Sequence, residues 1–162
     1  MFSTVAHWYY NAILALTSCV NFDTNVSNTV QTTAQRLNIT IPVARDAFLR
    51  LSRLGLLVEK TQKWTRAVQN QVVIPQIPAN FIREHHKQHL EKAKIALDTQ
   101  DLDAREFIGL TVSTDLQKIP EVKKRLRQFH LDMLEFLGDG EHTSVYQMST
   151  QFFRLDENAP EN

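Results

Sequence analysis

Three histidines lie close together in a charged stretch and are the first candidates for chemistry. His85 and His89 are four residues apart, so on a helix both would face one side and could bind a metal ion, with Glu84 or a distant carboxylate as a further ligand. The surrounding Lys and Arg favour a simpler interpretation, a solvated helix. The cluster also lacks the Glu that the metalloprotease pattern requires between its two histidines. We therefore expect no metal and no cofactor; His85 and His89 are the candidates should a metal bind.

Catalytic motifs are absent from the sequence, which argues against an enzyme. Cys19 has no neighbouring base to activate its thiol, and the patterns that mark nucleotide sites and hydrolases do not occur. A single cysteine excludes a disulfide framework, and no apolar run is long enough to span a membrane. Although 16–19 resembles a lipoprotein cleavage box, no Lys or Arg precedes Arg36, whereas a signal peptide begins with positive charge. We expect a cytoplasmic, non-enzymatic protein without a membrane association.

Basic residues are unevenly distributed along the chain. The 162 residues include 18 Lys and Arg and 18 Asp and Glu, but residues 1–78 have seven basic against three acidic residues and residues 79–162 have eleven against fifteen. The zero total argues against a bulk polyanion binder, while the N-terminal excess of +4 suits a local phosphate-binding surface. The residues that we predict to contact DNA are Arg36, Arg45, Arg50, Arg53, Lys60, Lys63 and Arg66.

Helices must position most of these basic residues. Apolar spacing predicts helices over 4–18, 29–37 and 41–54. We expect Asn38 to end the second helix in a left-handed conformation, and Thr40 to cap the third. The residues that the third helix would bury are Ala44, Ala47, Phe48, Leu51 and Leu54. Those that it would turn outward are Pro42, Arg45, Asp46, Leu49, Arg50 and Arg53.

A hairpin is expected after the third helix. Gly55 stops the helix, residues 56–60 read as a strand, 61–66 as a polar turn and 68–74 as a returning strand. Helix, short turn, helix and hairpin is the order of a winged helix-turn-helix, in which the last helix enters the major groove and the wing contacts the backbone or minor groove. Residues 1–78 are therefore predicted to form such a domain.

The rest of the chain completes an α+β fold class. We predict a helix over 80–97, a strand over 106–114, a helix over 120–137, a strand over 145–155 and a disordered tail over 156–162. Residues 79–155 would thus be an association domain made of a helix and a strand-helix-strand unit. Because a lone unit of this kind leaves its sheet unpaired, it should pack on the winged helix, on a second copy, or on both.

Two sets of residues give the sequence a family resemblance. They are the opening Trp8-Tyr9-Tyr10-x-x-Ile13 and the closing Val145-Tyr146-Gln147-Met148-x-x-Gln151-Phe152-Phe153-x-Leu155. With the winged-helix core between them, the sequence resembles the C-terminal region of a paralogous bacterial family expanded in bdellovibrios and fibre-degrading bacteria. The resemblance implies a transcriptional regulator. Family members carry a further N-terminal helix-turn-helix of the phage-repressor type, which this sequence does not include.

These observations predict a DNA-binding transcriptional regulator, a homodimer that places two recognition helices on double-stranded DNA. The main alternative is a non-catalytic adaptor, in which the winged helix binds a protein partner through the same wing and Leu49. A third is a small-molecule sensor with Trp8, Tyr146 and Phe152 around a pocket, although such aromatic residues more often belong to a core.

Overall fold

The computed structural model describes residues 7–67 and 79–156, with side chains from residue 82 onward in the second range. The chain divides into two compact units. Unit 1 comprises Met1–Ile108 and Glu141–Tyr146, and unit 2 comprises Gly109–Gly140 and Gln147–Asn162. Four predictions lie outside the described residues: the start of the first helix at 4–6, the returning strand over 68–74, the domain boundary at residue 78 and positions 157–162 of the disordered tail.

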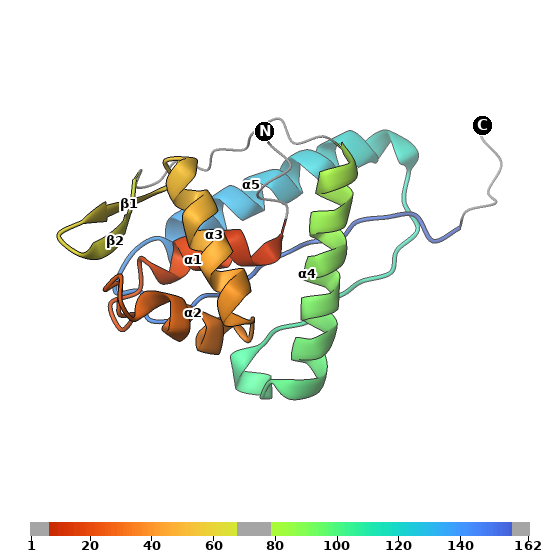
Figure 1. The fold of residues 1–162 in the computed structure, drawn as a ribbon. Helices are drawn as coiled ribbons and strands as arrows, with labels where there is room; N and C mark the ends of the chain where they lie inside the picture. Colours follow the sequence, from red (N-terminus) through yellow and green to blue (C-terminus); the bar gives the residue numbers. More distant parts are fainter. Residues whose placement is uncertain (1–6, 68–78, 157–162) are drawn as a thin grey trace. The chain divides into compact units, whose positions relative to one another are not determined.

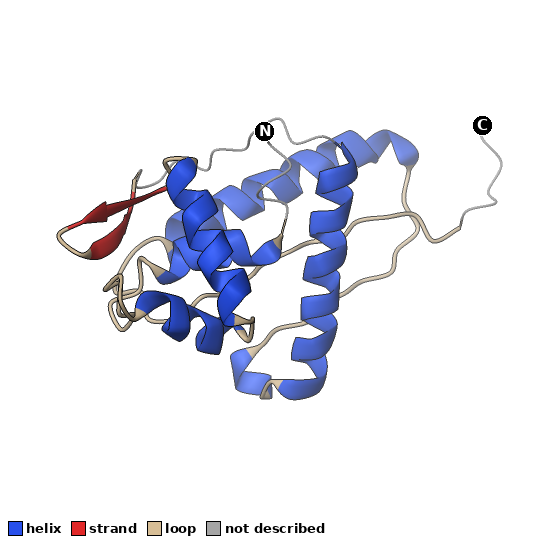
Figure 2. Cartoon of the chain, viewed as in Figure 1, coloured by secondary structure: helices blue, strands red, loops and turns tan. Residues whose placement is uncertain are grey.

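The described residues form an α+β structure of five helices and one small antiparallel sheet (Figures 1 and 2). Each predicted helix is present, and four of them have ends within two residues of those expected; the first, predicted over 4–18, is observed from Trp8 to Leu16. The helices are α1 (Trp8–Leu16), α2 (Thr29–Leu37), α3 (Ile41–Arg53), α4 (Ala79–Thr99) and α5 (Ile119–Leu137), with short 3-10 helices at Leu102–Ala104 and Leu116–Lys118.

The turn between α2 and α3 has the predicted left-handed residue. Asn38 has φ 50° and ψ 51°, and the next amide, that of Ile39, donates to the Ala34 carbonyl at 3.0 Å, which ends α2. Thr40 lies at the N-cap position of α3, but its side chain makes no capping hydrogen bond, so the predicted cap is present in position only. Pro42 lies in the first turn, where a missing amide hydrogen does no harm. The chain therefore reverses within three residues and brings α2 against α3.

A small core holds α1, α3 and the hairpin together. The buried side chains in this cluster are Tyr10, Ile13, Leu14, Ala47, Phe48, Leu51 and Leu57. The Trp64 ring of the hairpin lies 5.6 Å from that of Phe48, so the sheet is anchored to α3. Cys19 is buried beside Leu16 and Phe22, as expected of a small apolar residue. Leu54, expected in the core, is instead 36% exposed, at the C-cap of α3.

The hairpin is tighter than the sequence predicted. Strand β1 (Leu57–Lys60) pairs with β2 (Lys63–Arg66), and the turn is only Thr61 and Gln62. These two residues have φ of 52° and 61°, the signs of a type I′ turn, whose twist matches that of the strands. The predicted six-residue turn over 61–66 is therefore wrong. The hairpin projects away from the three helices (Figure 1).

The chain between α1 and α2 contacts the edge of β2 that does not pair with β1. The sequence did not predict this contact. Asn25 forms an isolated antiparallel bridge with Lys63. The Val26 amide donates to the Gln62 carbonyl at 3.0 Å, and the Trp64 amide donates to the Thr24 carbonyl at 2.9 Å. Strand β2 is thus hydrogen-bonded on both edges.

The two strands predicted in the C-terminal half are wrong. Within the described residues, neither 106–114 nor 145–155 takes part in a ladder, so no strand-helix-strand unit forms. The alternation of side chains is present in the sequence, but a strand also needs a neighbour for its amides and carbonyls. The apolar members of the first segment point into solvent instead: Ile108 is 86% exposed and Leu110 is 81% exposed.

Candidate nucleic-acid interface

The outer face of α3 presents two of the predicted basic residues to solvent. Arg45 and Arg53 are exposed, while Phe48 and Leu51 are buried on the opposite face. Leu49 lies on the outer face between them and is 49% exposed. Because the core holds the inner face, this outer face is fixed in orientation and could enter a groove.

Arg50 is held by its own neighbours. Its Nε donates to a carboxylate oxygen of Asp46 at 2.8 Å. The nearby Tyr10, followed by Asp46, raises the pKa of the Arg50 guanidinium. Burial and the neighbouring Tyr9 raise the pKa of Tyr10 to about 12. Arg50 is thus half-buried and forms an ion pair with Asp46, whereas Arg45 and Arg53 are exposed.

The hairpin tip places two further basic residues together. Lys60 and Lys63 are direct cross-strand partners in the ladder, and both are exposed. Like charges directly opposite one another are unfavourable, and the turn that joins them has a β-branched residue, Thr61, at φ 52°, a rare conformation for that residue type. The hairpin therefore concentrates positive charge at its tip, where the repulsion between the two lysines is offset in part by Asp23 near Lys63.

Arg66 and Arg36 occupy different surroundings from the hairpin tip. Arg66 is half-buried at the other end of β2, opposite Leu57. Arg36 donates to the Asn21 side chain at 3.3 Å and to the Thr143 carbonyl at 3.2 Å, and it lies over the Phe22 ring. The Arg36 guanidinium thus joins 141–146 to the rest of unit 1.

The chain before α2 adds polar residues beside the hairpin that the sequence did not single out. Asp23 accepts from the Asn25 amide at 2.9 Å and from the Asn28 side chain at 3.1 Å. These two hydrogen bonds, in that order, lower the pKa of Asp23, and Lys63 adds to the effect. The signal that could have identified this turn is the run of Asp, Asn and Ser at 21–28, which favours side-chain bonds to backbone amides.

Comparison of the sequence with known families decides where the chain belongs. A family model matches residues 1–155. The chain belongs to the family described as Domain of unknown function (DUF4423). No curated protein and no solved structure matches it.

The histidine pair of this DUF4423 chain lies on α4. The Nε2 atoms of His85 and His89 are 3.0 Å apart. His89 is buried, and this burial, with smaller contributions from His85 and His86, lowers its pKa to about 4. No group of three or more His, Cys, Asp or Glu that could hold a metal occurs within residues 7–67 and 79–156. The two ring nitrogens are thus within hydrogen-bond distance of each other.

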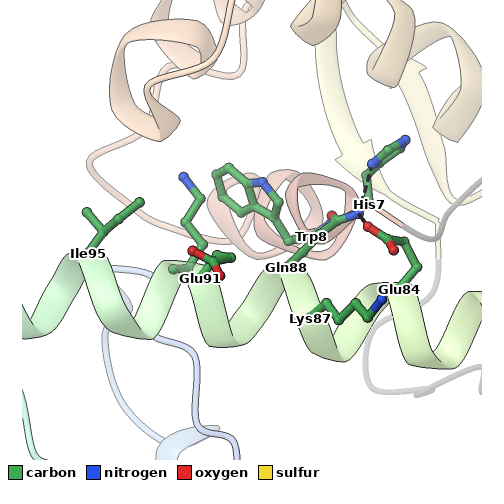
Figure 3. Close-up of a pocket in the computed structure, with 8 residues that line it drawn as sticks. His7, Trp8, Glu84, Lys87, Gln88, Glu91 and Ile95 are labelled. Atoms are coloured by element: carbon green, nitrogen blue, oxygen red, sulfur yellow. Dashed lines mark hydrogen bonds between the residues drawn. The ribbon is translucent and has the colours of Figure 1, made fainter.

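A shallow groove separates the first turn of α1 from α4 (Figure 3). Its volume is about 320 Å³. The Trp8 amide donates to the Gln88 side chain at 3.1 Å, and the Lys92 ammonium lies 3.8 Å from the centre of the Trp8 ring. Trp8 is thus used to dock α4 on α1. The other residues proposed for a small-molecule pocket, Tyr146 and Phe152, do not line this groove.

One further result concerns membranes. Among the helices of the described part of the chain, none combines the length and the apolar character that crossing a bilayer requires.

Proposed function

We propose that this chain is a non-catalytic, DNA-binding transcriptional regulator that acts as a homodimer, with α3 in the major groove and the β1–β2 hairpin against the phosphate backbone. The observation that carries the proposal is the hairpin tip. Lys60 and Lys63 are exposed and face each other across the ladder, an arrangement that is unfavourable alone and favourable against a polyanion.

The order of elements supports a winged helix as the scaffold. A bridge at Asn25 lies between α1 and α2 and pairs with β2, and α3 leads directly into the hairpin. In a winged helix the recognition helix and the wing approach the same duplex. Arg45 and Arg53 on the outer face of α3 would then contact bases or phosphates in the groove, and Lys60 and Lys63 would contact the backbone.

The surroundings of the other three arginines assign them smaller roles in this proposal. Arg50 is paired with Asp46 and would position α3 rather than read bases. Arg36 is bound to the Thr143 carbonyl. Arg66 lies at the base of the hairpin. We therefore propose Arg45, Arg53, Lys60 and Lys63 as the main DNA contacts, about four per subunit.

The test is fluorescence anisotropy with labelled random duplex DNA. Eight phosphate contacts in a dimer give a slope of about −7 for log K against log salt, so affinity should fall roughly 10⁴-fold between about 50 and 200 mM salt. An Arg45→Ala/Arg53→Ala/Lys63→Ala variant should lose most of this affinity.

A matched control removes three exposed basic residues from α4: Arg83→Ala/Lys87→Ala/Lys94→Ala. It should bind DNA nearly as well as the wild type if the surface is local to α3 and the hairpin. Equal loss in both variants would contradict the assignment of the surface, and no binding of the wild type at low salt would contradict the DNA-binding proposal itself.

A protein-binding adaptor is the second candidate, and the apolar residues on α3 favour it. Leu49 is 49% exposed and Ile41 is 44% exposed, and apolar side chains at the centre of a helix surface are typical of protein contacts. This candidate predicts no salt-dependent DNA affinity, and partner binding that survives loss of Lys63 but not Leu49→Asp.

A further inference from the structure

Unit 2 has no buried side chain among its described residues, although it contains a 19-residue helix. Its four phenylalanines, Phe129, Phe136, Phe152 and Phe153, are between 43% and 74% exposed. At roughly 200 Å² for a fully exposed aromatic side chain, they leave about 480 Å² of apolar surface. Exposed Leu side chains, among them Leu131 and Leu134 on α5, add to this apolar surface.

A seam along α5 shows what kind of partner fits this surface. Steps of three and four residues place Val122, Arg125, Phe129, Asp132 and Phe136 on one side of the helix. The order of residue types is approximately symmetric about Phe129, with opposite charges on its two sides: apolar, positive (four residues before Phe129), aromatic, negative (three residues after it), apolar. Phe129 is 50% exposed and Phe136 is 74% exposed.

The symmetry fits an antiparallel copy of the same helix. About a two-fold axis at Phe129, Arg125 of one chain faces Asp132 of the other, Val122 faces Phe136, and Phe129 meets its equivalent. Such an isologous interface forms each contact twice. Within one chain Arg125 and Asp132 are seven residues apart, about 10 Å along the axis, so they do not pair with each other.

The distribution of charge along the whole of α5 also favours an antiparallel pair. Residues 119–129 contain four Lys or Arg and one Glu, whereas residues 130–137 contain two acids and no Lys or Arg. This order opposes the helix dipole, which favours acids near the N-terminus and bases near the C-terminus. In an antiparallel pair, the basic half of each helix lies beside the acidic half of its partner, and the unfavourable order becomes a favourable one.

The existing partners of the seam's charges can be exchanged. Arg125 pairs with Glu121 at 3.0 Å, with side chains 79% and 54% exposed, and Asp132 accepts from the Gln128 amide group at 2.7 Å. Exposed pairs one turn apart contribute little. Binding a second copy would therefore give up little in return for two desolvated Arg–Asp pairs.

We propose that the seam Val122–Arg125–Phe129–Asp132–Phe136 of α5 pairs antiparallel with the same seam of a second copy of this chain. The pairing specifies the interface of the homodimer in the proposed function. The role of this pairing in regulation rests on the proposed function, but whether the pairing forms can be measured without DNA.

The experiment is sedimentation velocity of the full chain at about 1 to 100 μM in low salt. The wild type should be a dimer. Arg125→Asp and Asp132→Arg should each raise the dimer dissociation constant at least tenfold, because each places like charges together. The Arg125→Asp/Asp132→Arg double variant should return to within about threefold of the wild type. Arg127→Asp is the matched control: it lies about 160° around the helix from Phe129, so it should raise the dissociation constant much less than either seam variant.

A disulfide test fixes the direction of the helices. Oxidised Phe129→Cys should form a covalent dimer, whereas Phe136→Cys should not, because its neighbour across the interface is Val122. The native Cys19 is buried, and oxidised wild type gives the background. Circular dichroism of each variant checks that α5 remains folded.

Several results would overturn the pairing. They are a monomeric wild type at 100 μM, single charge variants that dimerise normally, a double variant that does not recover, or Phe136→Cys dimers as abundant as those of Phe129→Cys. If the wild type is monomeric and Phe129→Glu destabilises the fold, the seam is covered within its own chain. A dimer that fails to bind DNA would contradict the proposed function and leave the pairing supported.

Discussion

Reversing one charge at the hairpin tip should change stability and DNA binding in opposite directions. Lys60 lies opposite Lys63 in the ladder, so Lys60→Glu replaces a repulsive cross-strand pair by an attractive one. If the two lysines are present to bind phosphate, the variant should fold more stably and bind DNA more weakly than the wild type.

The size of the stability effect follows from the geometry of the ladder. Charged groups on directly opposed side chains lie about 6 Å apart, which corresponds to about 0.7 kcal/mol in a medium with the dielectric constant of water. Turning repulsion into attraction doubles this to about 1.4 kcal/mol at low salt, and screening at physiological ionic strength roughly halves the gain. For a chain of this length the melting temperature should rise by about 3–5 °C at low salt and half as much at physiological salt.

Differential scanning calorimetry at two salt concentrations, beside anisotropy with duplex DNA, measures both effects. Loss of one phosphate contact per subunit should reduce the salt slope from about −7 to about −5. The neutral variant Lys60→Gln is the control and should gain about half of the stability. A Lys60→Glu protein no more stable than the wild type would refute the reasoning from the ladder, and undiminished DNA affinity would refute the role of the hairpin.

Three further perturbations test the fold. Gly55→Ala should lower stability by about 1 kcal/mol, because Gly55 has φ 69°, which strains an alanine backbone. An added Cβ meets nothing within 4 Å, so no steric clash adds to this cost. The melting temperature should fall by about 2–4 °C, and an unchanged melting temperature would contradict this. Phe48→Ala should lower the free energy of unfolding in urea by about 3–5 kcal/mol, whereas Leu49→Ala beside it should change it by less than about 0.5 kcal/mol. His89 has a folded-state pKa lowered to about 4, so the unfolded state takes up a proton first and stability should fall as pH drops from about 6.5 to 4. His89→Gln should show a smaller loss over the same window, and parallel urea titrations of the two proteins would reveal it.

The helices were predictable because their signals are local. Apolar spacing, Asn38 in the turn and Gly55 after α3 each act within a few residues, and the structure has all of them where the sequence predicts. The hairpin strand was misplaced because its turn, Thr61 and Gln62, contains no Gly or Asn, the residues that usually mark a type I′ turn. Because three of the four residues at 63–66 are polar, this segment was predicted as part of the turn and not as a strand.

Long-range contacts set the limits of the prediction for the candidate site. All seven basic residues are described by the structure, but the sequence could not separate those that are exposed from those already bound. Arg36 interacts with Thr143, which is 107 residues away, and β2 pairs with a single residue, Asn25. The strands expected over 106–114 and 145–155 failed for a related reason, since alternation shows where side chains point but supplies no partner strand.

The hairpin tip and the α5 seam have one property in common that joins the two proposals. Lys60 and Lys63 repel each other within the chain, and α5 arranges its charges against its own dipole. Neither arrangement improves the stability of a single chain. Neutral residues at these exposed positions would change that stability little. Each becomes favourable when a particular partner is added, a polyanion in the first case and an antiparallel copy in the second. A regulator that reads two half-sites needs both partners at once, because the spacing of two α3 helices on DNA is set by the dimer that carries them.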